Sequence, residues 1–236
     1  MVKRQVLLAA VLSVWASSVF AQDNVIAQRM RFCSINPGYS MADVVETARA
    51  FEWSDSTAPG VVIFREAIAV SADFEYDFIL DSYYPSYSDL VEKRVAFRNR
   101  PGGRNGRGFA DVATCAPRAV IASVRFAVPP GGSLPQASPT AVARCEMNGA
   151  TLADAMTAAE GLSQATGGRG AVAMPTFGGT RTEMGSTVSM RVYFPSTTGF
   201  GEAMDRLQQN PQGPSGDMSC STPSLWLSHL VFARNN

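Results

Sequence analysis

The stretch CSINPGYSMAD (residues 33–43) returns in a shortened form as CEMNGATLAD (residues 145–154). Both stretches carry a cysteine, an asparagine, a glycine, a hydroxyl residue and an aspartate in the same order. Later landmarks recur in matching order: residues 83–86 (YYPS) as 193–196 (YFPS), Cys115 as Cys220, and Phe126 as Phe232. The shared order predicts two diverged copies of one unit, joined head to tail.

This repetition divides the chain into four predicted segments. We expect a signal peptide at 1–21, a first repeat at 22–128, a linker at 129–140 and a second repeat at 141–236. The linker prediction rests on composition, because proline, glycine and serine dominate residues 129–139 and these residues favour turns and irregular chain.

The first 21 residues have the pattern of an export signal. Lys3 and Arg4 precede an apolar run over residues 6–14, and Val19-Phe20-Ala21 is a small-residue cleavage pattern. The apolar run is shorter than the roughly 20 residues that span a bilayer. We therefore expect cleavage near Ala21 and a periplasmic or secreted mature protein without a membrane span.

Charge and composition exclude several classes of partner. The chain has 20 basic and 20 acidic residues, so it lacks the positive surplus that drives nucleic-acid binding. One histidine and no C-x-x-C spacing give no basis for a metal site. No cofactor is expected.

The four cysteines predict two disulfides. Export favours oxidation, and a duplicated unit should close its own bridge, which selects Cys33–Cys115 and Cys145–Cys220 among the three pairings that four cysteines allow. Each bridge would close a loop of roughly 80 residues and stabilise the fold by about 4 kcal/mol in the chain-entropy model.

Hydrophobic periodicity predicts the same elements in both copies. Apolar residues follow Ser40 and Thr151 at the same helical steps, which indicates one buried helix stripe in each copy. The expected strands are 27–35, 61–70, 76–84 and 118–128, then 142–147, 171–177, 187–194 and 225–233; a second helix follows Ser86 in one copy and covers about 200–208 in the other.

The order β-α-β-β-α-β is that of a ferredoxin-like unit, an antiparallel sheet with both helices on one face. Strands one and four are then neighbours, and the paired cysteines lie at their adjoining ends. Because the open face of such a sheet must be buried, we expect the two units to pack together as one pseudo-symmetric α/β barrel of the α+β class.

This element order resembles the dimeric α/β-barrel superfamily, which includes cofactor-independent antibiotic-biosynthesis monooxygenases and NIPSNAP-like proteins. The Cys…Asn…Gly…Ser/Thr…Asp element is similar to one in uncharacterised exported bacterial proteins. The resemblance covers the mature chain at the level of element order and implies a fold; it carries no catalytic motif.

The paired aspartates fit a structural role. Ser40-x-x-Asp43 and Thr151-x-x-Asp154 are capping boxes, in which the hydroxyl and the carboxylate satisfy amides at a helix N-terminus. Asn36 and Asn148 fit the strand-to-helix turns.

Strand alternation points to a candidate site inside the barrel. If apolar positions pack under the helices, the opposite positions face the lumen. This rule gives a candidate ligand-binding set of Asp77, Asp81, Tyr83, Ser123, Arg125, Ser189, Arg191, Tyr193 and His229. Asp81 and Arg191 stand at corresponding positions of the two copies. His229 is a weak candidate for acid–base catalysis, and the same residues could instead form the core of a closed barrel.

Three functions fit these residues. The leading expectation is binding of a small molecule, or assembly, in the cell envelope; an enzyme of monooxygenase-like or lyase-like type that uses the lumen, and a purely structural envelope protein, are the alternatives. The Arg/Gly loop at 98–108 fits an anion-binding loop or a solvated loop. A monomer can satisfy the barrel, because both halves lie in one chain.

Overall fold

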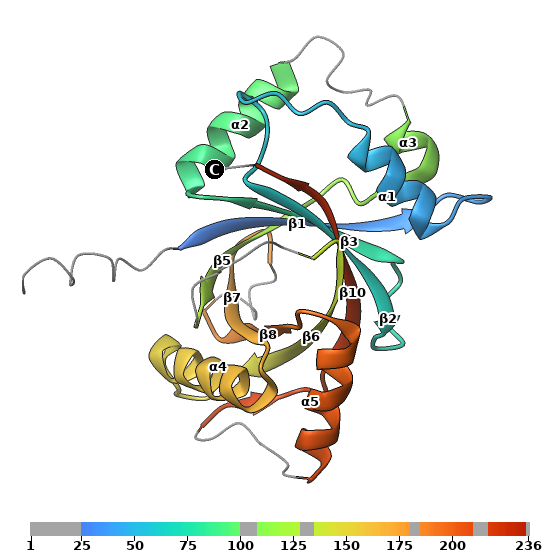
Figure 1. Ribbon diagram of the computed structural model, residues 1–236. Helices are drawn as coiled ribbons and strands as arrows, with labels where there is room; N and C mark the ends of the chain where they lie inside the picture. Colours follow the sequence, from blue (N-terminus) through green and yellow to red (C-terminus); the bar gives the residue numbers. More distant parts are fainter. Residues whose placement is uncertain (1–24, 100–107, 128–134, 180–184, 210–216, 235–236) are drawn as a thin grey trace, which may run out of the picture.

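The computed structural model describes residues 25–99, 108–127, 135–179, 185–209 and 217–234. Eight antiparallel strands in these ranges close into a barrel (Figure 1). The strands are β1 (Ile26–Ile35), β2 (Val61–Ala69), β3 (Phe78–Tyr84), β5 (Val120–Phe126), β6 (Ala137–Glu146), β7 (Arg169–Phe177), β8 (Thr187–Tyr193) and β10 (Ser224–Ala233). Their order around the barrel is β10-β2-β3-β1-β5-β7-β8-β6, and pairing of β6 with β10 closes it.

The helices lie outside the barrel in two groups. The first group is α1 (Met41–Arg49), α2 (Tyr87–Asn99) and the short α3 (Phe109–Val112); the second is α4 (Leu152–Thr166) and α5 (Thr197–Gln209). In Figure 1 the first group covers the upper side of the barrel and the second group covers the lower side. The result is an α+β fold in which every barrel strand has a lumen face and an outer face.

Strand order is the same in the two halves of the chain. The first half reads β5-β1-β3-β2 and the second reads β10-β6-β8-β7, which is the order that the sequence predicts for a ferredoxin-like unit. The halves join where β2 pairs with β10 and β5 pairs with β7. Each seam therefore brings the second strand of one half against the last strand of the other.

Both capping boxes are confirmed. Ser40 Oγ accepts from the Asp43 amide while the Asp43 carboxylate accepts from the Ser40 amide at 2.7 Å, and Thr151 with Asp154 repeats the arrangement at α4. These hydrogen bonds lower the pKa of both aspartates from the ordinary value, the side-chain bond to the hydroxyl being the largest cause. The aspartates serve the helix starts.

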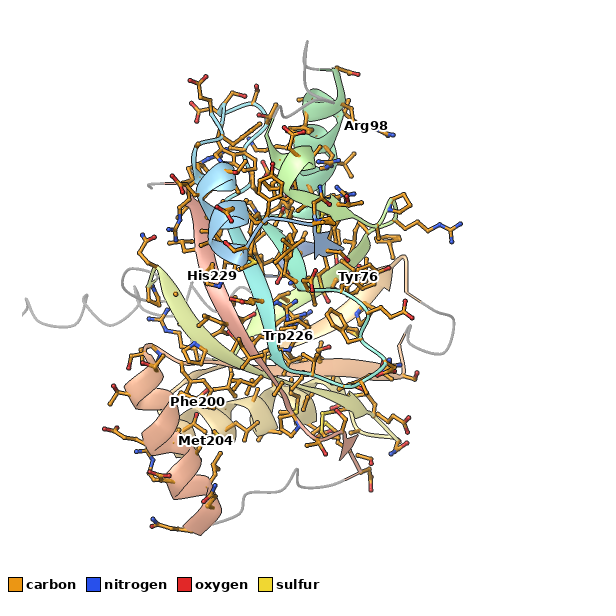
Figure 2. All side chains as sticks on the ribbon, turned by 90° about the vertical axis from the view of Figure 1, so that its right-hand side faces the viewer. Tyr76, Arg98, Phe200, Met204, Trp226 and His229 are labelled. Carbon is orange, nitrogen blue, oxygen red and sulfur yellow. A yellow bond between two sulfur atoms is a disulfide. The ribbon has the colours of Figure 1, made fainter. Side chains whose placement is uncertain are left out.

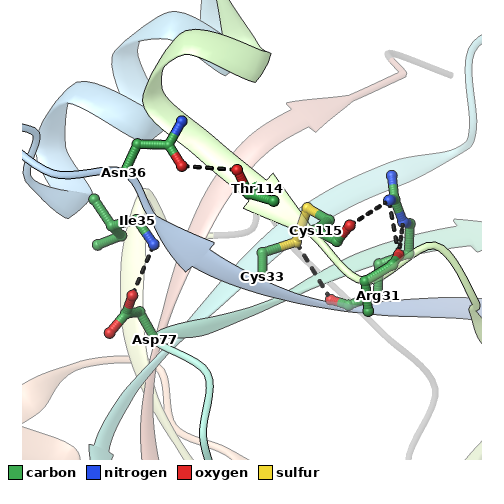
Figure 3. The surroundings of a disulfide bond; sticks show 8 residues. Arg31, Cys33, Ile35, Asn36, Asp77, Thr114 and Cys115 are labelled. Atoms are coloured by element: carbon green, nitrogen blue, oxygen red, sulfur yellow. Dashed lines mark hydrogen bonds between the residues drawn. A yellow bond between two sulfur atoms is a disulfide. The ribbon is translucent and has the colours of Figure 1, made fainter.

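Both predicted disulfides form, Cys33–Cys115 and Cys145–Cys220, across sequence separations of 82 and 75. Each bridge ties the first strand of a half to a short strand that the sequence did not predict, β4 (Ala113–Cys115) or β9 (Ser219–Cys220). Figure 3 shows the first bridge, beside which Thr114 donates to Asn36 at 2.8 Å.

The first strand of the second half begins earlier than the strand predicted at 142–147. Strand β6 starts at Ala137, inside the range 129–140 that composition assigns to a linker, and residues 137–142 pair with β10. The local composition gives no sign of this pairing, because the partner strand lies more than 80 residues away in the sequence. The pairing closes the barrel.

The predicted signal peptide falls outside the described residues. Among the residues that the structure describes, no helix has the length and apolar character of a membrane span.

Candidate functional site

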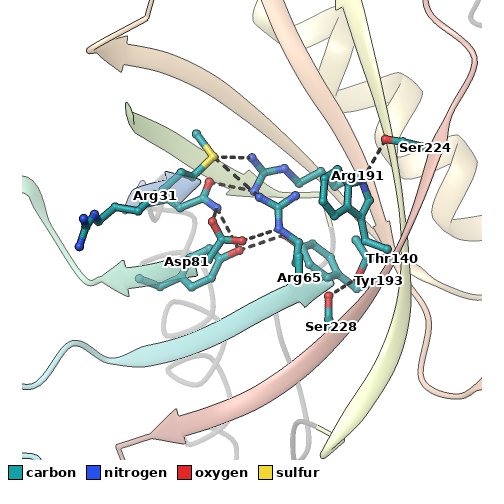
Figure 4. A network of polar contacts seen from close by, with 12 residues as sticks. Arg31, Arg65, Asp81, Thr140, Arg191, Tyr193, Ser224 and Ser228 are labelled. Carbon is teal, nitrogen blue, oxygen red and sulfur yellow. Dashed lines mark hydrogen bonds and ion pairs between the residues drawn. The ribbon is translucent and has the colours of Figure 1, made fainter. Parts of the chain in front are cut away.

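A polar cluster fills the middle of the barrel, and we call it the lumen network. It consists of Gln28 and Met30 from β1, Arg65 from β2, Asp81 and Tyr83 from β3, and Arg191 and Tyr193 from β8. Figure 4 shows it from close by. Gln28 and Asp81 are fully buried, and Arg65 and Arg191 are each 2% exposed. Charged side chains this deep in a fold require specific partners.

Gln28 is the centre of the lumen network. Its Nε2 donates to Asp81 Oδ1 at 2.7 Å and to the Tyr83 hydroxyl at 3.2 Å, and its Oε1 accepts from Arg191 Nη1 at 2.8 Å. One amide side chain therefore links a carboxylate from the first half of the chain to a guanidinium from the second half.

Arg65 and Asp81 form a buried ion pair on neighbouring strands, in which Arg65 Nε donates to Asp81 Oδ2. Burial is the largest single influence and lowers the pKa of Arg65, but attraction to Asp81, Tyr83 and Tyr193 and the hydrogen bond to Asp81 together outweigh burial and raise that pKa above its ordinary value. The guanidinium also lies over the Trp226 ring, 5.6 Å from its centroid. Arg65 is thus held in its charged form.

Two tyrosines complete the lumen network, with the hydroxyls of Tyr83 and Tyr193 3.3 Å apart. Burial, together with the nearby Tyr193 and Asp81, raises the pKa of Tyr83 well above its ordinary value. Tyr83 is therefore a neutral phenol at physiological pH.

The sequence-predicted set divides between three places. Asp81, Tyr83, Arg191 and Tyr193 meet in the lumen network, and Ser189 lies on the same face of β8, half-buried. Asp77 is exposed before β3, where its carboxylate accepts from the Ile35 amide at 2.7 Å (Figure 3).

The prediction was wrong about the face of three residues, Ser123, Arg125 and His229, which lie on the outer face. In β5 the lumen positions are Ala122 and Val124, which pack with lumen residues such as Tyr83, whereas Ser123 and Arg125 alternate with them. In β10 His229 pairs with Phe64, a residue of the core beneath α1.

The error has a physical cause. The sequence rule assumes that apolar positions face the helices, but the lumen beside β5 and β7 is itself apolar, with Val124, Ala171 and Ala173 packed together. Where both faces of a strand are buried, apolar character no longer tells the inner face from the outer one.

His229 instead lines an open groove on the outer face. We call it the α1 groove; it measures about 680 Å³ and is lined by Ser40, Met41, Ala42, Val45, Glu46, Arg49, Glu66 and His229. Figure 2 shows His229 on β10 beside α1. The groove lies at the seam where β2 of the first half pairs with β10 of the second.

His229 and Glu66 are paired across this seam, with His229 Nε2 2.8 Å from Glu66 Oε2. A carboxylate only accepts hydrogen bonds, so Nε2 carries the proton and, in the neutral ring, Nδ1 holds the lone pair. No hydrogen bond to Nδ1 is recorded among the described residues. The side chain of His229 is 17% exposed, so solutes in the groove can reach it.

Arg49 fixes α1 over the seam. Its Nε and Nη2 donate to the Leu230 carbonyl at 3.0 and 2.7 Å, and Nη2 also reaches the Gln136 carbonyl at 3.4 Å. These bonds tie α1 of the first half to β10 and to the residue before β6, so α1 is held against the seam as one wall of the groove.

Sequence reasoning missed Gln28, Arg65 and Glu66. Both strands also carry other charged residues, so polarity alone did not distinguish Gln28 and Arg65. The role of Glu66 depends on the pairing of β2 with β10. Among the described residues no group of three or more metal-ligating side chains comes together. Most of the Arg/Gly loop, residues 100–107, lies outside the described ranges.

Comparison with known proteins gives a fold and no family. No protein-family model matches the chain, and no curated protein matches it. Among solved structures, a protein of Fusobacterium nucleatum with a provisional monooxygenase assignment superposes with a TM-score of 0.50 at 8% identity, over 89% of this chain and 94% of that one.

Two further solved structures resemble the chain less closely. They are an anthrone oxidase-like protein (TM-score 0.39, 14% identity, 91% of this chain and 98% of that one) and a mutant chlorite dismutase from Candidatus Nitrospira defluvii (TM-score 0.47, 12% identity, 86% and 91%). At 8% identity the comparison with the protein of Fusobacterium nucleatum speaks for the fold alone, and it supports the α+β barrel that the sequence predicts.

Proposed function

We propose that this protein is an enzyme that acts on a small molecule bound in the α1 groove, with His229 as the general base. The observation that carries the proposal is the pairing of His229 Nε2 with Glu66 at 2.8 Å in the wall of an open groove of about 680 Å³. A base that is oriented by a carboxylate and open to a bound solute is the common arrangement for proton abstraction.

The pair has the chemistry that this role requires. Histidine is the side chain that ordinarily exchanges protons near neutral pH. Glu66 holds the ring in the tautomer that leaves Nδ1 bare, and its negative charge stabilises the imidazolium that forms when Nδ1 takes a proton. Positioned general bases contribute about 10² to 10⁴ in rate.

The walls of the groove indicate the kind of substrate. Met41, Ala42 and Val45 give an apolar surface along α1, whereas Glu46 and Arg49 place charges further along the helix. We infer a small, partly apolar molecule with an acidic C–H or O–H group. Monooxygenase-like and lyase-like reactions that start by proton removal both fit this inference.

A generic substrate for base catalysis tests the proposal. In 5-nitrobenzisoxazole a base removes the ring C–H proton while the N–O bond breaks, which releases a coloured cyanophenolate. We expect the protein to accelerate this ring opening above the rate of free imidazole, and His229→Gln to abolish the acceleration. Glu66→Gln should lower kcat more than it changes KM, because Glu66 acts on the ring of His229 and not on the reacting C–H group.

Glu92→Gln, on the exposed face of α2, is the matched control and should keep the full rate. Equal rates of ring opening for the unmodified protein and His229→Gln would show that His229 is not a general base. If the two proteins show equal reaction rates and small molecules still bind in the groove, the protein is a binding protein and not an enzyme of this kind.

We also propose, from the repeated sequence landmarks, that the two halves arose by duplication and form two ferredoxin-like repeats in a pseudo-symmetric barrel. The identical strand order of the halves supports this proposal.

Export of the mature chain remains a proposal that rests on the sequence of residues 1–21. N-terminal sequencing of protein recovered from the periplasm should give a chain that begins near Gln22; an intact Met1 in that fraction would contradict cleavage.

A further inference from the structure

The lumen network contains more positive than negative charge. Two buried guanidinium groups, Arg65 and Arg191, share one buried carboxylate, Asp81. Among the described residues of the lumen faces Asp81 is the only buried carboxylate, because Glu146, at the end of β6, is exposed. Arginine stays protonated in proteins, and an uncompensated buried charge is strongly unfavourable. The barrel as described therefore lacks one negative charge.

The missing charge belongs beside Arg191. Arg65 Nε binds Asp81 directly, whereas Arg191 reaches that carboxylate only through the neutral amide of Gln28. Arg191 Nε is buried without a hydrogen-bond partner, and Nη2 contacts only the sulfur of Met30 at 3.7 Å. A thioether is a weak acceptor. One edge of this guanidinium thus lacks a strong acceptor.

The tyrosine pair shows the same shortage. Tyr83 and Tyr193 bring two hydroxyl protons to the lumen, and the bond between them uses one. No described residue accepts the other. Tyr83 does not supply the missing negative charge itself, because burial raises its pKa and keeps it neutral.

The neighbours of Arg191 are small. Arg191 pairs with Ala171 on β7, and the next lumen position of that strand is Ala173, whereas the corresponding positions of β2 carry Ile63 and Arg65. The alanine side chains on this side of the barrel are short, so a small molecule beside Arg191 would displace few protein atoms. An eight-stranded barrel is wide enough either to be filled by its own side chains or to hold one small ligand.

We propose that the lumen binds a small carboxylate, whose two oxygens accept from the Nε and Nη2 edge of Arg191. Arginine matches the geometry of a carboxylate with two parallel N–H donors. The carboxylate replaces the weak Met30 contact, and the spare tyrosine proton is available to it as a further donor. This site lies on the opposite face of the sheet from the α1 groove and does not depend on the role of His229.

Thermal unfolding in the presence of simple carboxylates tests the proposal. The probes are sodium formate, acetate and benzoate, added to protein in a buffer without carboxylates, with sodium chloride at equal ionic strength as the reference. We expect at least one probe to raise the unfolding midpoint by several degrees, with saturation, because a ligand that binds only the folded state stabilises it.

Met30 offers a matched pair of variants. Met30→Glu places a carboxylate where the sulfur contacts both arginines, at 3.7 and 3.8 Å, so it should raise the midpoint without added carboxylate and abolish the response to the probes. Met30→Gln has the same length and no charge, so it should keep the response. Arg191→Met should lose it, whereas Arg206→Met, outside the barrel on α5, should keep it.

Several results would overturn the proposal. The absence of a response to all three carboxylates in the unmodified protein would do so, as would equal responses in Met30→Glu and Met30→Gln. If Arg191→Met does not fold, the Met30 pair still decides the question. His229→Gln should keep the carboxylate response, so failure of the proposed enzyme activity and failure of this inference are separate outcomes.

Discussion

Asp81 and Arg191, which stand at corresponding positions of β3 and β8, are joined inside the barrel through Gln28, whose amide donates to Asp81 at 2.7 Å and accepts from Arg191 at 2.8 Å. Opposite charges from the two halves of the chain thus meet through one neutral side chain. The two halves differ in charge at the position where they come together.

Removal of the Asp81 charge should destabilise the fold strongly. Asp81→Asn leaves Arg65 and Arg191 both buried without a carboxylate, and loss of one partner of a buried ion pair costs about 3–5 kcal/mol. The free energy of unfolding in urea measures the effect. Asp205→Asn, on the exposed side of α5, should change it by less than about 0.5 kcal/mol. Similar effects of both substitutions would show that the lumen network does not stabilise the barrel.

Tyr83 should make the protein sensitive to alkali. Its pKa in the folded state lies above the unfolded value of about 10, so its contribution to stability is complete below pH about 10 and is lost as the pH rises through the raised pKa. The free energy of unfolding should fall less steeply above pH 10 in Tyr83→Phe than in the unmodified protein. Tyr39→Phe, at an exposed tyrosine, is the control; identical slopes for all three proteins would count against the buried phenol.

The two disulfides should stabilise the fold to a similar extent. Their sequence separations of 82 and 75 correspond to about 4 kcal/mol each in the chain-entropy model. The double substitutions Cys33→Ala with Cys115→Ala, and Cys145→Ala with Cys220→Ala, should therefore lower the urea midpoint by similar amounts. Peptide mapping without reduction checks the pairing, and a bridge between the two halves would refute it.

The capping box of α4 should contribute about 1 kcal/mol, because Thr151→Ala leaves an amide at the helix start without its acceptor. Thr157→Ala, in the middle of the same helix, should not destabilise the fold, since alanine is the better helix former. Urea unfolding of both variants distinguishes a cap from a general effect of threonine removal.

Much of the fold could be predicted because landmarks of the sequence recur in the same order. The repeated cysteines select the disulfide pairing, the repeated helical phase selects the buried stripe of α1 and α4, and the alternation of Asp81 with Tyr83 and of Arg191 with Tyr193 points to the lumen. These features depend on local spacing, which the sequence shows directly.

The candidate site could be predicted only in part, because it depends on the seams between the halves. The face of His229 follows from the pairing of β10 with β2, and the start of β6 follows from the same closure of the barrel. The lumen beside Val124 is apolar, so β5 has no contrast between a polar and an apolar face from which its orientation could be predicted. Side-chain alternation gives two faces, and only tertiary pairing says which of them lies inside.

The tautomer of His229 tests the central claim most directly, and because it is the only histidine of the chain its signals need no assignment. Nitrogen-15 NMR of the full chain labelled at histidine measures which ring nitrogen carries the proton. We predict a protonated Nε2 and a bare Nδ1 in the neutral ring, with loss of this preference in Glu66→Ala. A protonated Nδ1, or two nitrogens that average to equal shifts as in free imidazole, would contradict a general base oriented by Glu66.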